Sequence, residues 1–128
     1  MGKKIPAEYS GGGTVLSNTN TTTSAYNATN GSISLCSLNL TKGIWIVHGF
    51  ISRSTSESRI LQTRLRGANA HDKWHRSAGE SGGGVDVVEI VTVNDDSAKI
   101  VFDGYQFSDV SQTSTFTAYL QAYKISDY

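Results

Sequence analysis

The amino-acid sequence predicts an all-β domain that folds as an antiparallel sandwich or barrel. Short stretches rich in β-branched and aromatic residues recur along the chain, separated by turn residues roughly every 8–12 positions. No window shows a sustained apolar repeat of about 3.6 residues, and residues that favour helices are sparse. A parallel sheet would require crossover helices, which this pattern does not supply. At 128 residues the chain has the length of one domain.

The balance of charge argues against two classes of partner. The chain has 11 basic and 11 acidic residues, and only 17% of its residues are charged. This composition provides no field that would attract nucleic acid or an anionic membrane, so neither is expected as a partner. No run of about 20 apolar residues is available to span a bilayer. Because residues 1–4 are not followed by an apolar stretch, we expect no signal peptide.

The first part of the chain is predicted to be the least regular. Residues 1–13 contain two lysines, the single proline and a run of three glycines, which is typical of a flexible N-terminal tether. Residues 14–128 are then expected to form one β-sandwich domain. Within it, residues 14–32 are dense in Thr, Asn and Ser, a mixture that favours one or two irregular strands.

The centre of the chain predicts two strands joined by a tight turn. Residues 33–40 form an apolar segment whose alternation slips by one position near Cys36, as a β-bulge would make it do. Residues 41–43, Thr-Lys-Gly, predict a turn. Residues 44–51 follow as a strand that is apolar on both sides.

The second half predicts four further strands. Residues 59–66 alternate, with Leu61, Thr63 and Leu65 on one side of the strand. Residues 67–84 are expected to be a long loop, and residues 85–93 a strongly apolar strand. The composition of residues 94–97, Asn-Asp-Asp-Ser, predicts a turn. Two strands, residues 99–107 and 115–125, complete the set.

The last strand is apolar on both of its faces. Ala118, Leu120 and Ala122 share one side, whereas Tyr119, Tyr123 and Ile125 share the other. One side can pack against the opposite sheet of a sandwich, and the other is most simply covered by a second copy of the chain. We therefore predict a homotrimer, because a modest patch repeated around a threefold axis closes a symmetric interface. The residues predicted at this interface are Tyr119, Tyr123, Ile125, Tyr105 and Phe107.

The densest polar cluster lies in the predicted loop at residues 67–84. A solvated loop tip and a recognition loop are both compatible with its composition. As a recognition loop, it would offer the flat apolar ring of a tryptophan beside several hydrogen-bonding groups, which suits a sugar ring or a protein epitope. Two histidines four residues apart would suit zinc only on a helix, and the surrounding glycines argue against a helix. The candidate ligand-binding residues are Trp74, His71, Asp72, His75 and Arg76.

The remaining reactive residues predict no catalytic, metal or cofactor site. Cys36 is the single cysteine, and we expect it to be a small buried side chain, with an intermolecular disulfide as the alternative. His48 lies mid-strand and is expected either to be partly buried or to lie at an interface. The spacing of Asp95 and Asp96 matches no calcium loop, and no nucleophile motif is present. A non-enzymatic protein is therefore predicted.

Three segments together resemble the head domains of phage tail fibres. The segment at residues 37–50 has the family's leucine-x-leucine turn and its tryptophan-hydrophobic-hydrophobic-x-glycine strand. Residues 87–102 are similar to the family's strand-turn-strand, and residues 118–125 to its terminal strand. The resemblance covers about residues 30–126. In the first segment the matching residues are Leu38, Leu40, Gly43, Trp45, Ile46, Val47 and Gly49.

The resemblance implies a jelly-roll sandwich of the C1q and tumour-necrosis-factor kind, assembled as a homotrimer at a fibre tip. It further implies attachment to a bacterial surface, often to a glycan or teichoic acid, and a location on the virion or the cell surface. The fibre stalk is absent from this sequence, and the loop at residues 67–84 matches no family motif. Two alternatives stay open: a C1q-like bacterial surface or spore-coat domain, and a small lectin that binds sugar without trimerising.

Overall fold

The structure consists of antiparallel β-strands, as the sequence predicts. The computed structural model describes residues 13–26, 33–53, 60–76, 84–107 and 112–127. Within these residues the elements are strands only, and every pairing between them is antiparallel. The hydrogen-bonded order is β1-β6-β2-β5-β3-β4. The strands are β1 (Val15–Tyr26), β2 (Ile33–Arg53), β3 (Ile60–Arg66), β4 (His75–Arg76), β5 (Gly84–Phe107) and β6 (Gln112–Ser126).

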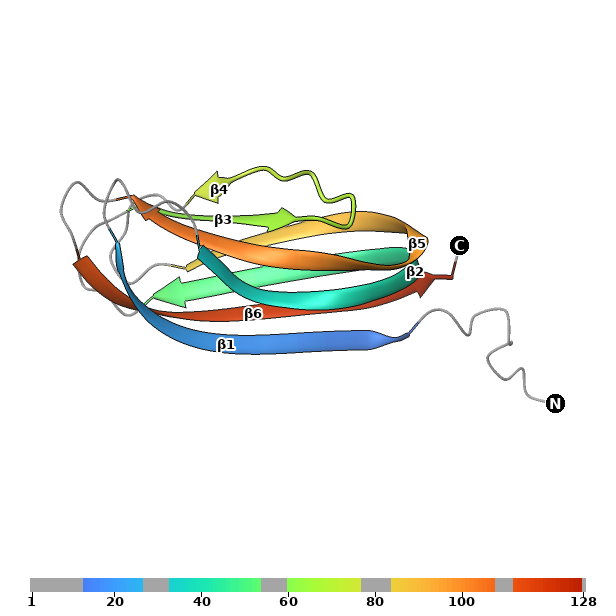
Figure 1. Cartoon of the computed structure of the whole chain (residues 1–128), viewed down its shortest axis with the longest axis horizontal. Helices are drawn as coiled ribbons and strands as arrows, with labels where there is room; N and C mark the ends of the chain where they lie inside the picture. Colours follow the sequence, from blue (N-terminus) through green and yellow to red (C-terminus); the bar gives the residue numbers. More distant parts are fainter. Residues whose placement is uncertain (1–12, 27–32, 54–59, 77–83, 108–111, 128) are drawn as a thin grey trace.

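The two longest strands form a ribbon that folds back on itself. β5 has 24 residues, and a straight strand of that length would extend for about 80 Å. Figure 1 shows that β2 and β5 instead turn back together at one end of the molecule. The pairing register shifts there, between Thr41 and Gly43 on β2 and between Ser97 and Val93 on β5. The turns predicted at residues 41–43 and 94–97 are therefore places where a continuous ribbon folds.

Folding the ribbon produces two layers. The β3 layer contains residues 33–41 of β2, residues 97–107 of β5, and the short strands β3 and β4. The β6 layer contains β1, β6, residues 43–53 of β2 and residues 84–93 of β5. The two layers lie over each other in Figure 1, and the apolar core fills the space between them.

The core is built from the inward-facing side chain of every second residue. In β6, Ala118, Leu120 and Ala122 are buried, which confirms the inner face predicted for this strand. In β3, Thr63 and Leu65 are buried as well. The largest fully buried side chains are Trp45, Phe102, Leu40, Ile51, Leu65, Ile100, Leu120 and Val47.

The fold-back point of β2 is held by specific contacts. Gly43 has φ +146°, and a Cβ atom there would collide with the side chain of Lys124. The indole Nε1 of Trp45 donates a 2.9 Å hydrogen bond to the carbonyl of Thr41. The ammonium of Lys124 donates to the hydroxyl of Thr41 at 3.0 Å and pairs with Asp127 at 2.8 Å. These contacts explain why a glycine and a tryptophan stand two positions apart in the segment at residues 37–50.

The structure corrects two expectations and confirms a third. β1 is one regular strand of 12 residues along β6, not an irregular segment, because its alternating Thr, Ser and Asn side chains suit an exposed strand. The predicted loop at residues 67–84 contains β4, which pairs with β3. The predicted bulge is confirmed between Ser34 and Cys36. Of the predicted tether at residues 1–13, residues 1–12 lie outside the described part of the chain.

Candidate functional site

The outer side of the β6 layer carries many exposed apolar side chains. Ile90 is 64% exposed and Val88 is 59% exposed, both on the first half of β5. The phenol rings of Tyr119 and Tyr123 are nearly half exposed, at 47% and 44%. We call this surface the outer β6 face. Its large apolar residues are Val15, Ile46, Phe50, Val88, Ile90, Tyr119, Tyr123 and Ile125.

Strand pairing aligns these side chains in rows across the layer. Tyr123 of β6 pairs with Val15 of β1 on one side and with Ile46 of β2 on the other. Ile46 in turn pairs with Ile90 of β5. One unbroken apolar row therefore crosses four neighbouring strands. Residues paired in this way lie about 5 Å apart on the same face of a sheet.

A groove crosses the same face one row further along. It has a volume of about 430 Å³ and is lined by residues of β1, β6 and β2. The aromatic rings of Phe50 and Tyr119, with centroids 6.1 Å apart, form one wall. The groove ends toward β5, where His48 pairs with Val88. Its lining residues are Ser17, Asn18, Thr19, His48, Phe50, Tyr119, Leu120 and Gln121.

The outer β6 face carries little charge. In the paired parts of its four strands, the outward-facing ionisable side chains other than tyrosine are His48 and Asp86. Their Nε2 and Oδ2 atoms lie 3.4 Å apart, an ion-pair distance without hydrogen-bond geometry. A surface that is both apolar and nearly uncharged is expected to be covered by a partner.

The structure brings together some of the predicted interface residues and separates others. Tyr119, Tyr123 and Ile125 all project from the outer β6 face. Tyr105 lies in the β3 layer, beside Trp74 at a centroid distance of 6.1 Å. The two groups belong to different layers, so Tyr105 does not share a surface with Tyr119. The side chain of Phe107 lies outside the described part of the structure.

A buried carboxylate organises the outer side of the β3 layer. Asp103 is 1% exposed, and its Oδ2 accepts 2.8 Å hydrogen bonds from the Nε atoms of both Arg64 and Arg66. Its Oδ1 accepts from Arg66 Nη2 and from the hydroxyl of Ser34, each at 3.2 Å. Burial alone raises the pKa of Asp103, but the hydrogen bonds and charges of Arg66 and Arg64 outweigh burial and hold the pKa below its ordinary value.

The predicted ligand-binding tryptophan packs onto this network. The guanidinium of Arg64 lies 4.5 Å from the centroid of the Trp74 ring, a cation–π distance. Arg64 also pairs with Asp72 at 3.3 Å. Trp74 is still 37% exposed, so part of the indole can reach a ligand. The structure therefore brings Trp74 and Asp72 together, but it joins both to Arg64.

The other predicted site residues point elsewhere. The backbone N–H of His71 donates a 2.7 Å hydrogen bond to Glu89, whose side chain is buried in the first half of β5. The second carboxylate oxygen of Glu89 has no hydrogen-bond partner among the described residues. His75 is exposed in β4 and pairs with Thr63, and the side chain of Arg76 lies outside the described residues. Residues 67–76 therefore form a strap between the layers, while their role in ligand binding stays a prediction.

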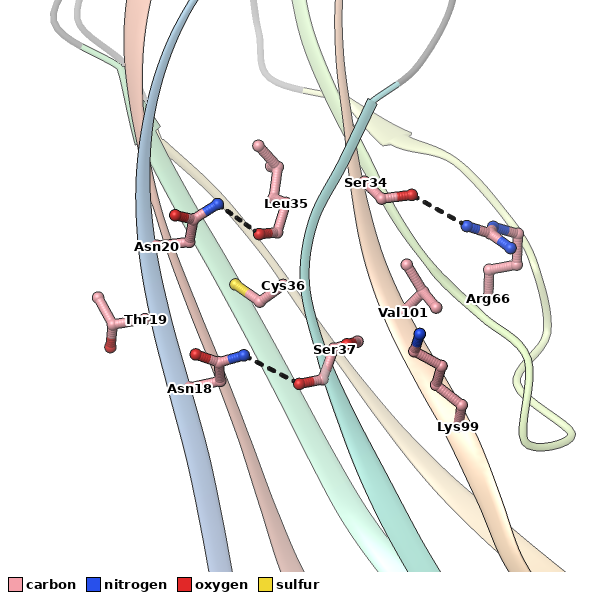
Figure 2. A pocket seen from close by; sticks show the side chains of 10 residues that line it. All are labelled: Asn18, Thr19, Asn20, Ser34, Leu35, Cys36, Ser37, Arg66, Lys99 and Val101. Carbon is pink, nitrogen blue, oxygen red and sulfur yellow. Dashed lines mark hydrogen bonds between the residues drawn. The ribbon is translucent and has the colours of Figure 1, made fainter.

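A second groove lies where the edge strands of the two layers meet. It has a volume of about 500 Å³ and lies against β1, the first half of β2, Arg66 and Lys99 (Figure 2). The Nδ2 atoms of Asn18 and Asn20, two residues apart on β1, donate to the carbonyls of Ser37 and Leu35 at 3.0 and 2.7 Å. These amides close the sandwich side where no backbone ladder is described between β1 and β2. The alternation of Asn with Thr on β1 is the sequence signal for them.

The buried cysteine forms part of this second groove. Burial raises the pKa of the Cys36 thiol to about 11, partly offset by a hydrogen bond from the backbone of Asn20. Its Sγ lies 3.6 Å from the carbonyl oxygen of Ala118. Cys36 is thus a buried side chain, as the sequence predicts.

Two further findings concern the described residues as a whole. They include no cluster of three or more His, Cys, Asp or Glu side chains arranged to hold a metal ion. Nor does any helix among them have the length and apolar character needed to cross a membrane.

Comparison with known proteins finds similarity in structure only. No family model matches this chain, and no curated protein matches it in sequence. The VP2 subviral particle of infectious bursal disease virus is similar in fold, with a TM-score of 0.59 and 8% identity over 89% of this chain. The Gx strain of the same virus is similar with a TM-score of 0.52 and 16% identity over 88% of this chain.

This chain corresponds to only part of each viral protein. The chain spans about a third of them, 33% and 32% of their lengths. A subunit of the disulfide-linked pili of Bacillus endospore appendages matches over 98% of this chain at 12% identity, with a lower TM-score of 0.45. At such identities the viral similarity establishes the fold alone. The chain has an antiparallel all-β fold similar to viral jelly-roll domains.

Proposed function

We propose that this protein is a non-enzymatic structural module that assembles with further copies of itself through the outer β6 face. The observation that carries the proposal is the set of eight large apolar side chains exposed together on that face. With about 200 Å² for a large apolar residue, their exposed fractions correspond to roughly 750 Å². A stable protein interface of standard size covers about 800 Å² of each partner.

The charge of the face favours a second copy as the partner. Like charges on two identical faces would repel each other. Among the described residues, the ionisable groups of this face other than tyrosine are His48 and Asp86, an adjacent base and acid. The apolar rows across the layer then meet apolar rows of the same kind. Burial of aromatic and β-branched side chains is the main driving force for such association.

The proposed assembly is a homotrimer that forms part of a surface structure. The trimer rests on the apolar outer side of the last strand and on the sequence resemblance, whereas the role as a phage tail-fibre tip rests on the resemblance. The fold's similarity to proteins of viral particles is consistent with a virion setting. A C1q-like bacterial surface or spore-coat subunit is the alternative, since it has the same architecture and the same need for self-association. Attachment to a bacterial glycan through Trp74 and its neighbours belongs to this proposal as a further prediction.

The mass of the purified protein tests the assembly. Light scattering should give a particle of three times the chain mass of 13.8 kDa. Tyr119→Asp and Ile90→Asp should each dissociate it, because an unpaired charge in an apolar interface costs several kcal/mol, which is more than about tenfold in affinity. Asn39→Asp is the matched control, because Asn39 is exposed in the β3 layer. A parent protein that stays monomeric at high concentration would rule out the proposal.

A further inference from the structure

We infer that the outer β6 face docks by a ridge-into-groove contact, in which Val88 of one copy enters the groove beside Tyr119 of another while Ile90 packs on the adjoining row at Val15. This inference rests on the proposed self-assembly and specifies which parts of the face meet. Both elements of the contact are present on every copy, so the surface is complementary to itself.

The ridge is the edge of the layer. Val88 and Ile90 are the two most exposed of the large apolar residues, at 59% and 64%. They stand on the first half of β5, which pairs with β2 and is the last strand of the β6 layer among the described residues. Two β-branched side chains two residues apart project in the same direction, so together they form a short, stiff apolar ridge.

The groove begins at the opposite edge. On β1 and β6, its outward-facing lining residues are Ser17, Thr19, Tyr119 and Gln121, and the paired Ser17 and Gln121 form the row between those of Tyr119 and Tyr123. The difference in side-chain size between neighbouring rows creates the hollow. At about 430 Å³, the groove has room for branched aliphatic side chains. A side chain that enters the groove would contact the Phe50 and Tyr119 rings, which are otherwise in contact with water.

The position of Val88 keeps it from reaching the Ser17 end of the groove in its own copy. Val88 and Ser17 lie in the same row, with Gln121 and His48 between them. That separation is three strand spacings, about 14 Å. The Ser17 end of the groove can therefore receive Val88 only from another copy.

Two arrangements use this contact. A half-turn about an axis parallel to the strands lays β5 of one copy over β1 of the next and keeps the rows aligned, so Val88 of each copy enters the groove of the other at Ser17 and Ile90 meets Val15. In a ring, each ridge enters the groove of the next copy, which suits the proposed trimer. With rows aligned, Asp86 of one copy reaches the row of Thr19 and Tyr119, whose hydroxyls can donate to its carboxylate.

Disulfide trapping tests the contact. Val88→Cys and Ser17→Cys variants, carrying tags of different size, are mixed and oxidised at a concentration where the parent is assembled. Cross-linked pairs of unlike chains should form at least tenfold faster than in a mixture of Val88→Cys with Asn39→Cys, since Asn39 lies in the other layer. Native Cys36 can stay in place because it is buried.

Filling the groove gives an independent readout. Thr19→Trp adds apolar surface to the face, so general hydrophobic adhesion would become stronger. If the ridge must enter the groove, the indole ring of Thr19→Trp blocks it, and the affinity of the copies for one another should fall by at least tenfold. Circular dichroism and thermal unfolding of the variant check that the domain is intact.

The outcomes separate this inference from the proposed assembly. Assembled parent protein that gives no Val88–Ser17 cross-link above the control, or that tightens with Thr19→Trp, overturns the ridge-into-groove contact and leaves self-assembly standing. A parent that is monomeric at all concentrations overturns both. Cross-linked unlike chains together with a weakened Thr19→Trp assembly support the contact.

Discussion

The ring of Phe102 lies directly against the backbone of Gly49, so the two layers touch where the β6 layer has no side chain. A Cβ atom built on Gly49 would lie 2.7 Å from the ring. The position thus requires glycine for space, which gives a physical reason for its place in the segment at residues 37–50.

Gly49→Ala should destabilise the fold by about 1–3 kcal/mol, because the added methyl group overpacks a rigid core. Urea unfolding followed by fluorescence measures the change. In the double variant Gly49→Ala with Phe102→Leu, the smaller leucine side chain leaves room for the added methyl group. The double variant should therefore lose less stability than the sum of the two single variants, since the two residues are in contact. Purely additive effects of the two substitutions would show that the methyl group does not meet the ring.

Asp103→Asn should reduce stability at neutral pH by about 2–3 kcal/mol, because it removes a buried charge that two arginines share. The pKa of Asp103 is lower in the folded chain than in the unfolded chain, where aspartate titrates near about 3.9. Its carboxylate therefore stabilises the fold above pH of about 4, and this contribution is lost as pH falls through the lower folded value.

Unfolding free energies measured from pH 7 down to pH 2 check this prediction. The parent curve should fall toward that of Asp103→Asn at acid pH. Asp95→Asn, at an exposed turn position, should change stability by less than about 0.5 kcal/mol. Parallel curves for parent and Asp103→Asn would contradict the assigned pKa direction.

The thiol of Cys36 should react slowly in the folded protein. Its pKa of about 11, against an ordinary 9.0, leaves roughly 100-fold less thiolate at pH 8, and burial restricts access further. Iodoacetamide labelling followed by mass spectrometry should show little modification until denaturant is added. Rapid labelling of the native protein, or a disulfide-linked dimer on a non-reducing gel, would contradict the buried position.

Trp74→Ala should abolish binding to a bacterial surface polysaccharide if the strap at residues 67–76 is the ligand site, as the sequence predicts. The substitution also removes the contact with Arg64, with an expected cost of about 1 kcal/mol in stability. Lys73→Ala, an exposed neighbour, is the matched control. Binding on a glycan array that is equal for parent and Trp74→Ala would place the ligand site elsewhere.

Asn20→Asp should destabilise the fold more than Asn20→Ala does. The amide donates to the Leu35 carbonyl at 2.7 Å (Figure 2), and a carboxylate would turn an acceptor toward that acceptor. Loss of the hydrogen bond in the alanine variant should cost about 1 kcal/mol. Thermal unfolding at pH 7 compares the two variants, and equal stability would show that the amide is not the bridge between the layers.

Local alternation made much of the fold predictable. In the last strand, the positions of Ala118, Leu120 and Ala122 predicted one buried face, and the structure buries all three. The slip near Cys36 predicted the bulge. In each case the information lies within a few neighbouring residues, because side chains alternate along any extended strand.

Contacts between distant segments were less accessible to sequence reasoning. Tyr105 and Tyr119 have similar patterns around them, yet they lie in different layers. The polar cluster at residues 71–76 is compact in sequence, but His71 turns to Glu89 and Trp74 to Arg64. Which neighbour a side chain meets depends on strand pairing, and no local pattern encodes that choice.

The sequence by itself determined most of the strands, their buried faces and the excess of apolar surface near the carboxyl end, because each follows from residue type at a period of two. Only the tertiary structure decided that the β2–β5 ribbon folds over and aligns Val15, Tyr123, Ile46 and Ile90 in one exposed row. The physical reason is that register between strands is set by pairing across the whole chain, through hydrogen bonds and core packing that distant residues make together.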